Sequence, residues 1–478
     1  MTTASYNLSQ LGSQYNQGGT GAVARTTASK LQESVSVLDF GADPTGSTDS
    51  TAAINNAIAV AKSAYGGTVV FPPGIYTCAS QITMGAVQGV RFVGLSSNNQ
   101  ATGGATIKYT GTTSPFMSVS GSAASLSIEN LNIGYSNGSF TGTLISAPVN
   151  QFYLVNSVLS GYSVTSAQYL LDINSSVDVC INHTAFSGAQ YAISGQKSDG
   201  TGFANVVAIN QSQFTGLTTA AIRNPGQGWA ITACDFENLA NNKGAAIVMD
   251  SACTSIGLTI NGCWFGDATD ASGWIWILWQ GSGLSVTGCY FNGVGTNNPD
   301  AIKLLGTSYG ITINSCYFSH FANAINLGSY LSNGTSLVSN RFSGCTTNIA
   351  GTPVADHFSY QSYVWTPTPT NLTVVLGGGS VTYSGYYEKR GTYVYFSIVV
   401  TTTGGATTAA TAGSTSFSLP FTSTSGSGTY GTCAAASPNT ALAVGSGGFV
   451  GGSGIFTPSW TATSNAIVIT GSYQTTTL

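Results

Sequence analysis

The chain has 478 residues, of which 42% are hydrophobic and only 6% are charged, whereas ordinary soluble domains are roughly 25% charged. Its net charge of −4 provides no basic surface of the kind that attracts nucleic acid. The longest aromatic-aliphatic run, residues 274–279, is too short to span a bilayer. These features argue against nucleic-acid binding and membrane insertion, and they make any cluster of charged residues informative.

Residues 1–33 are polar, rich in glycine and without hydrophobic periodicity, which is typical of a segment that becomes ordered on a partner. We therefore interpret them as an attachment segment. They lack the basic start and apolar stretch of a secretory signal. We expect the chain to fold in a reducing cytosol, where its nine cysteines remain thiols.

A short helix and a strand are predicted next. Thr48 or Asp49 is a suitable helix N-cap, Ile54 and Ile58 lie on one face at helical spacing, and two glycines at 66–67 end the helix. The strand at 68–71 stops before two prolines, which cannot donate to a ladder. An amphipathic helix in this position would cover the open apolar end of a stacked β structure.

The same region carries a family resemblance. The stretches DFGADPTGSTDSTAAI and GGTVVFPPGIY resemble the opening of the pectate-lyase-like right-handed parallel β-helix proteins. YNQGGTGAVARTTASKLQESVSVLDFGA is similar to bacteriophage tailspike and tail-fibre proteins. The resemblance implies a homotrimer on the virion, held to a tail adaptor or baseplate protein by its N-terminal segment, that binds bacterial surface polysaccharide and often cleaves it. It implies no particular catalytic residues.

The middle of the chain repeats a hexapeptide that closes with Phe. Its apolar residues alternate with period two, which indicates short strands and turns. Equivalent positions recur every 22 to 29 residues, so the pattern predicts a parallel β-helix whose equivalent residues stack about 4.8 Å apart. The closing residues are Phe186, Phe214, Phe236, Phe265, Phe291, Phe318 and Phe342.

Four cysteines share the fourth position of this hexapeptide: Cys234, Cys263, Cys289 and Cys316. A small, weakly polar side chain suits the interior of a bend, so we expect a ladder of buried thiols. A metal cluster or disulfides are the alternatives, but no C-x-x-C or Cys/His spacing supports them, and the three histidines are too scattered for a metal triad. We expect no metal and no cofactor.

The repeat fades after Phe342, and residues 355–369 form a boundary rich in aromatic residues and proline. Beyond it, Thr and Ser alternate with Val, Tyr and Phe, which predicts a small antiparallel β-sandwich. The predicted division is an attachment segment at 1–33, a β-helix at 34–358 and a C-terminal sandwich at 359–478, which would serve trimerisation or receptor binding.

Three central coils differ from the others. The number of residues from the closing Phe of a coil to the next inward Ile is 7 or 8 in the outer coils. It is 10 or 11 in the three coils that end at Ile247, Ile275 and Ile302. We therefore expect three longer loops on one edge of the solenoid. They concentrate acidic residues in a chain that has few: Glu237, Asp267, Asp270 and Asp300.

The outward position before each Phe places Asp235, Trp264, Tyr290 and Tyr317 in one predicted column. Aromatic rings there would stack on sugars, and whichever of Trp274, Trp276 and Trp279 faces outward would extend the wall. We interpret this edge as a saccharide-binding groove.

Glycoside hydrolysis needs two carboxyl groups about 5 to 9.5 Å apart. Glu237 and Asp267 are the first choice, with Asp235, Asp270 and Asp300 as alternates. The acidic loops also fit simple Asx turns, and we interpret Asp172, on another coil, as structural. A non-enzymatic receptor-binding spike is the main alternative. A uronate lyase is less favoured because cations are few, and a secreted pectinase because no signal peptide is visible.

Overall fold

The structure is a computed structural model that describes residues 14–63, 66–96, 104–119, 125–162, 164–197, 200–237, 245–251, 253, 255–266, 275–293, 300–306, 308–328, 335–351, 363–390, 392–421, 431–437, 443–452, 454–463 and 466–475. The chain forms two compact units. The first is built from residues up to 305 with 317–326 and 342–350, and the second from 306–316, 327–341 and the residues from 351 on. The boundary predicted at residue 358 lies outside the described residues.

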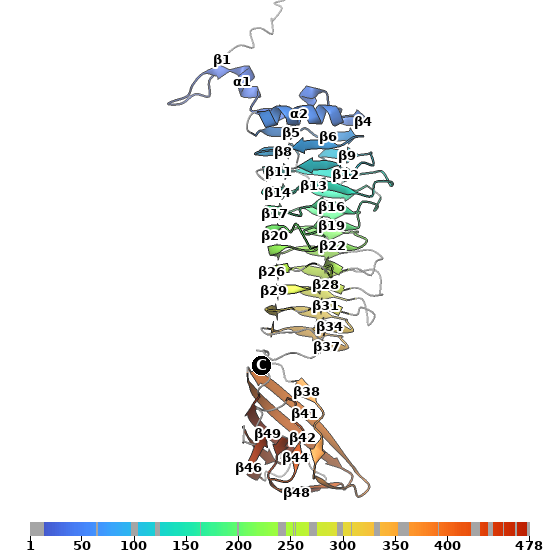
Figure 1. Cartoon of the computed structure of the whole chain (residues 1–478), viewed down its shortest axis with the longest axis vertical. Coiled ribbons are helices and arrows are strands. Elements are labelled where there is room, and N and C mark those ends of the chain that lie inside the picture. The colour runs from blue at the N-terminus through green and yellow to red at the C-terminus, as the bar shows by residue number, and fades with distance from the viewer. Residues whose placement is uncertain are drawn as a thin grey trace, which may run out of the picture. The chain divides into compact units, whose positions relative to one another are not determined.

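The solenoid consists of three parallel sheets, and each coil after the first contributes one strand to each sheet (Figure 1). Sheet 1 contains β3 (Ser34–Ser36), β5 (Thr68–Phe71), β8 (Val90–Gly94), β11 (Ser125–Glu129), β14 (Gln151–Val155), β17 (Val177–Asn182), β20 (Asn205–Asn210), β23 (Gln227–Thr232), β26 (Ser255–Asn261), β29 (Gly281–Thr287), β32 (Ile311–Asn314) and β35 (Thr335–Ser336).

Sheet 2 contains β4 (Thr45–Asp49), β6 (Gly74–Cys78), β9 (Ala105–Tyr109), β12 (Leu131–Tyr135), β15 (Val158–Gly161), β18 (Ala185–Ser187), β21 (Gln213–Thr215), β24 (Asp235–Glu237), β27 (Trp264–Gly266), β30 (Tyr290–Asn292), β33 (Tyr317–Ser319) and β36 (Arg341–Ser343). Sheet 3 contains β7 (Ile82–Gly85), β10 (Met117–Val119), β13 (Thr143–Ser146), β16 (Tyr169–Asp172), β19 (Tyr191–Ser194), β22 (Ala220–Arg223), β25 (Ala245–Val248), β28 (Ile275–Trp279), β31 (Asp300–Leu304), β34 (Asn323–Asn326) and β37 (Thr347–Ala350). The predicted parallel β-helix is confirmed.

The closing Phe residues form a continuous stack inside sheet 2. Phe236 and Phe265 have ring centroids 4.7 Å apart at an interplanar angle of 4°, and Phe265 and Phe291 are 4.6 Å apart at 8°. All three are fully buried. The spacing equals about one rung of a sheet, so the sequence repeat and the structural repeat coincide.

The cysteine position forms a second interior ladder. The Cys234 backbone N–H donates to Cys263 Sγ at 3.4 Å, and the Cys263 N–H donates to Cys289 Sγ at the same distance. Asn340 continues the series, since its Oδ1 accepts from the Cys316 N–H. All nine cysteines are described, and each is a thiol that forms no disulfide. The hydrogen bond with Cys263 and burial raise the pKa of the Cys234 thiol, so this thiol stays protonated at neutral pH.

Helix α2 (Thr51–Ser63) contacts β3, β5 and β7 at the N-terminal end of the solenoid. Its predicted stripe is confirmed, because Ile54 and Ile58 are at most 1% exposed. Asp49 lies just before the helix, and its carboxylate accepts from the Thr51 N–H at 3.0 Å. Preceding elements are β1 (Gln14–Tyr15), β2 (Arg25–Thr26), α1 (Thr27–Leu31) and the 3-10 helix η2 (Val37–Phe40).

The second unit carries two antiparallel sheets. The three-stranded sheet contains β40 (Thr373–Val375), β43 (Thr407–Ala410) and β48 (Trp460–Thr463). The nine-stranded sheet runs in the order β38 (Tyr363–Trp365), β41 (Ser380–Arg390), β42 (Tyr393–Thr403), β49 (Ala466–Gln474), β45 (Gly431–Ala436), β46 (Ala443–Gly451), β47 (Gly454–Phe456), β44 (Ser416–Phe417) and β39 (Pro369–Thr370). Residues of both sheets, such as Ile398 and Trp460, share one core, as the prediction of a sandwich requires.

No helix in the described part of the chain is long and apolar enough to cross a bilayer.

Candidate functional site

The predicted outer column of sheet 2 exists. Strand pairing places Asp235 opposite Trp264, Trp264 opposite Tyr290, and Tyr290 opposite Tyr317 on successive rungs. The rings are parallel: Trp264 and Tyr290 lie 4.4 Å apart at 7°, and Tyr290 and Tyr317 lie 4.9 Å apart at 15°. Trp264 is 37% exposed. The column therefore forms one aromatic ridge that begins next to a carboxylate.

The stacking changes how this ridge can contact a sugar. Because the three rings cover one another's inner faces, a glycan would meet their edges, the Tyr hydroxyls and the indole face on the Asp235 side of the stack. Gly266 makes room for the indole, since a Cβ at that position would come within 2.4 Å of Trp264 Nε1. Face-on stacking of a sugar, which the sequence suggested for these rings, is therefore open only to the outer indole face of Trp264.

Two carboxylates lie at the start of the ridge on strand β24. Asp235 and Glu237 flank the inward-facing Phe236 and are both partly buried. Alternate residues of a strand point to the same side, and their Cα atoms are about 6.5–7 Å apart. Gln213, one rung earlier, donates from Nε2 to Asp235 Oδ2 at 3.2 Å. This backbone spacing lies within the range over which two carboxyl groups can serve glycoside hydrolysis.

Three further predicted site residues, Asp267, Asp270 and Trp274, lie outside the described residues. The strands on either side of these residues are described. β27 in sheet 2 ends at Gly266, which pairs with Glu237, and β28 in sheet 3 begins at Ile275. The neighbouring connections, which span 238–244 and 294–299, also run from sheet 2 to sheet 3. All three longer connections therefore leave the same edge, as the spacing predicted.

Asp300 is not the exposed loop carboxylate that we expected. It is 2% exposed at the start of β31 and accepts hydrogen bonds from Asn323 Nδ2 at 2.9 Å and Asn326 Nδ2 at 3.0 Å. Lys303 lies 3.8 Å away. A buried charge is retained only when it is paired and hydrogen-bonded, and Asp300 uses its carboxylate to join two rungs.

Trp276 and Trp279 are also corrected, because both are fully buried and offer no surface to a glycan. The pairing shows why the sequence misled: Ile277, and not Ile275, aligns with Ile247 and Ile302. Trp276 consequently occupies an interior position that is alanine in the neighbouring rungs, where its Nε1 donates to the Asn292 carbonyl at 3.3 Å.

Sequence reasoning missed a polar cluster on sheet 3. Tyr169 and Tyr191 are stacked at 5.2 Å, and the Arg223 guanidinium lies 5.2 Å from the centre of the Tyr191 ring and donates to the Tyr169 hydroxyl. Asp250 accepts from Arg223 at 2.6 and 3.1 Å and from the fully buried Asn224. The signal was available, because Tyr169 and Tyr191 share one position of the sheet 3 repeat.

Asp172 lies beside this cluster and pairs with Ser194 on the next rung. Burial raises the pKa of its carboxyl, against opposing hydrogen bonds from Asn174 and Ser194 and the charge of Lys197.

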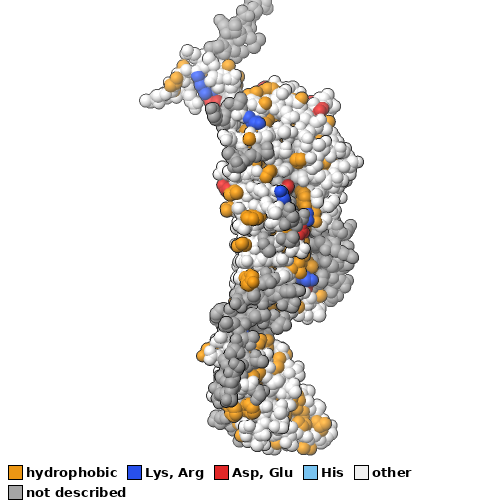
Figure 2. Space-filling view, viewed as in Figure 1, with side chains coloured by type: hydrophobic (Ala, Val, Ile, Leu, Met, Phe, Trp, Pro, Cys, Tyr) orange, Lys and Arg blue, Asp and Glu red, His pale blue; other side chains and the backbone are white. Residues whose placement is uncertain are grey.

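On the face seen in Figure 2, most of the surface is uncharged, and several of the few Lys, Arg, Asp and Glu side chains lie beside the middle of the solenoid. In the described ranges, no three His, Cys, Asp or Glu side chains are grouped as metal ligands would be.

Comparison with known proteins assigns the first part of the solenoid. Residues 34–266 match the model of the family described as rhamnogalacturonase A/epimerase, pectate lyase-like. This part of the chain is therefore similar to pectate-lyase-like β-helix proteins, in agreement with the resemblance of residues 39–76. The curated proteins compared with the chain give no match.

Several solved structures are similar to the chain at low identity. ORF18 of Geobacillus virus E2 aligns with 94% of the chain and 82% of its own length at 16% identity and a TM-score of 0.45. The Dettilon tailspike protein aligns with 94% of the chain and 96% of its own length at 13% identity and a TM-score of 0.45. DFA-IIIase from Arthrobacter chlorophenolicus A6 aligns with 67% of the chain and 92% of its own length at 13% identity and a TM-score of 0.47.

Proposed function

We propose that the chain is a bacteriophage tailspike that binds bacterial surface polysaccharide along the aromatic ridge of sheet 2 and hydrolyses it at Asp235 and Glu237. The observation that carries the proposal is the carboxylate pair at the start of a stacked Trp264, Tyr290 and Tyr317 column, in a chain with only 6% charged residues. The tail-protein resemblance of residues 15–42 supports the virion location.

The two carboxyl groups take different roles. Glu237 protonates the leaving glycosidic oxygen, while Asp235 acts as the carboxylate that attacks the sugar or activates water. The Gln213 amide donates to Asp235, which suits a group that remains charged. The ridge holds the glycan through ring edges and hydroxyls, so that the scissile bond lies over β24. Asp267, which follows Gly266 in the sequence and lies outside the described residues, is the alternate carboxylate.

Glu237→Gln and Asp235→Asn test the assignment. Each should lower the release of reducing ends from host polysaccharide by about 10²–10⁴-fold, the usual contribution of a general acid or base, while adsorption to cells is retained. Asp178→Asn is the matched control, since Asp178 is exposed on an earlier coil. Wild-type cleavage rates in both carboxamide variants would refute the catalytic pair.

The ridge alone also supports a binding protein without catalysis. Trp264→Ala removes the exposed end of the stack and should weaken retention on polysaccharide. If wild-type protein releases no oligosaccharides while Trp264→Ala weakens retention, the chain is a receptor-binding spike. A uronate lyase is less supported, because Arg223 is paired with Asp250 and Lys303 lies beside Asp300.

The assembly is part of the same proposal. A homotrimer held to a tail adaptor or baseplate protein through residues 1–33 follows from the tail resemblance and from solenoid faces with few charges. Sedimentation at micromolar concentration should give three times the chain mass of 48.7 kDa. A monomer under these conditions would contradict the trimer.

A further inference from the structure

The nine-stranded sheet of the second unit carries an ordered row across six of its strands. Pairing aligns the row from Glu388 on β41 to Phe456 on β47. The row begins with an acidic residue and an aromatic residue, continues with two hydroxyl residues and ends with two aromatic residues. Its members are Glu388, Tyr395, Ser472, Thr432, Phe449 and Phe456.

This row lies on the outer side of the sheet. Val394 and Phe396 are in the core, so Tyr395 between them points outward and is 44% exposed. Val450 and Ile455 are also core residues, which places their neighbours Phe449 and Phe456 on the outer side, where the two rings stack at 4.8 Å and 16°.

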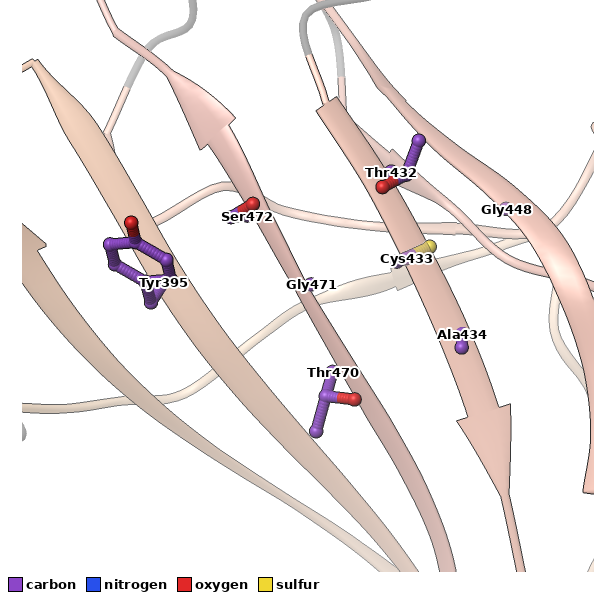
Figure 3. Close-up of a pocket in the computed structure, with 8 residues that line it drawn as sticks. All are labelled: Tyr395, Thr432, Cys433, Ala434, Gly448, Thr470, Gly471 and Ser472. Carbon is purple, nitrogen blue, oxygen red and sulfur yellow. The ribbon is translucent and has the colours of Figure 1, made fainter.

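The centre of the row is hollow. Figure 3 shows Tyr395, Ser472, Thr432 and Thr470 around this depression, which has a volume of ≈ 460 Å³. Ala434 lies opposite Thr470, so the floor carries only short side chains. Tyr395 on β42 and Gly448 on β46 are the lining residues farthest apart across the strands, and these strands lie three strand spacings apart, about 14 Å between backbones.

We propose that this hollow binds a neutral saccharide. Sugars combine apolar C–H faces with many hydroxyl groups, and the site offers an exposed Tyr ring beside the hydroxyls of Ser472, Thr432 and Thr470. Its volume is within the range of about 300–1,000 Å³ found for small-ligand sites. No charged side chain lines the hollow, and the neighbouring Glu388 disfavours an acidic sugar.

The composition of the floor favours a saccharide over a second protein chain. The buried centre of a protein interface is typically apolar and aromatic, whereas this hollow is lined by three hydroxyl residues, small residues and one aromatic ring, that of Tyr395. The inference stands apart from the proposed cleavage site, because it uses no residue of the solenoid.

The test measures binding of the full-length chain to an array of bacterial surface polysaccharides, neutral and acidic, supplemented with dextran and galactomannan. Wild-type protein should bind at least one neutral polysaccharide, and Tyr395→Ala should bind it about tenfold more weakly, as expected for the loss of one stacking ring. Tyr395→Phe should retain most of the affinity. Tyr309→Ala, at a residue that is 49% exposed outside the sheet, should bind like wild type.

Binding of no neutral polysaccharide, or equal binding by wild type and Tyr395→Ala, would overturn the inference. So would a change of oligomeric state in Tyr395→Ala with unchanged glycan binding, because the face would then be a contact between copies of the chain. The cleavage proposal is separable: Glu237→Gln should lose hydrolysis without losing this binding, and Tyr395→Ala should still cleave soluble oligosaccharide.

Discussion

Inward-facing and outward-facing residues alternate along the strands of sheet 2, but the two sets differ in how much the residue type changes from rung to rung. Inward, the residue after each outer position is Phe on every rung from 186 to 342. Outward, the column changes from Ala185 and Gln213 to Asp235, and then to the aromatic ridge. The difference teaches that the inward position of the repeat maintains the fold, while the neighbouring outward position can change in chemistry from rung to rung.

Sheet 3 is an exception to this division between a structural inner side and a variable outer side. There the outer side also holds rungs together, because Arg223 reaches back to Tyr169 and Tyr191 and forward to Asp250. The Arg223 side chain is only 16% exposed. An outer position can therefore be structural when its charge is enclosed by partners from several coils.

The sharpest test of the division compares two adjacent residues. Phe265→Ala should lower the free energy of unfolding by about 3–5 kcal/mol, since it opens a cavity in the stack between Phe236 and Phe291. Trp264→Ala should cost about 1 kcal/mol or less, the value of one exposed ring contact. Denaturant titration with a probe of the solenoid measures both. Equal losses would mean that the ridge is as structural as the core.

Arg223→Ala tests the exception on sheet 3. It should cost about 1–3 kcal/mol, because it removes charge-assisted hydrogen bonds and leaves Asp250 with fewer donors. Arg91→Ala is the control: Arg91 also pairs with a carboxylate, that of Glu129, but its side chain is 51% exposed, so the loss should stay below about 1 kcal/mol. If the two variants lose the same stability in thermal unfolding, the sheet 3 network is an ordinary surface contact.

The thiol ladder gives a third comparison within the interior. Cys263→Leu should destabilise the solenoid by about 1–3 kcal/mol because it adds volume to a packed rung, whereas Cys263→Ser keeps the acceptor for the Cys234 N–H and should cost less. Both variants should keep the function of the folded protein. Loss of binding or cleavage with unchanged melting would assign the thiols a chemical role.

The smallest expected effect is a pH dependence at Asp172. An unfolded Asp titrates near a pKa of about 3.9, and burial raises the folded pKa. The stability that this shift contributes is therefore present below the unfolded pKa and is lost as the pH rises through the folded pKa. As the pH rises through this window, the free energy of unfolding of Asp172→Asn should increase relative to that of wild type, and the difference should then level off. A difference that does not depend on pH would contradict the effect of burial on Asp172.

Much of the site could be placed from the sequence because a solenoid converts residue spacing into position. The hexapeptide register alone put Asp235, Trp264, Tyr290 and Tyr317 in one column. Spacing failed at β28, where several apolar residues in succession left the alignment of Ile275 and Ile277 ambiguous. A one-residue ambiguity changes which face a side chain occupies, and this is why Trp276 and Trp279 were kept as candidates for an outward-facing wall.

The sequence alone thus established the parallel β-helix, its capping helix and the antiparallel C-terminal fold, since these follow from periodicity, turn residues and end-capping. Three-dimensional packing was needed to show that Asp300 is enclosed by amides, that the ridge rings cover one another, and that Arg223 joins residues from Tyr169 to Asp250. Such features depend on side chains that meet across rungs or, in the nine-stranded sheet, across antiparallel partners with unequal connections. No local pattern encodes those contacts, because the partners lie 20 to 80 residues apart and meet only after the chain has folded.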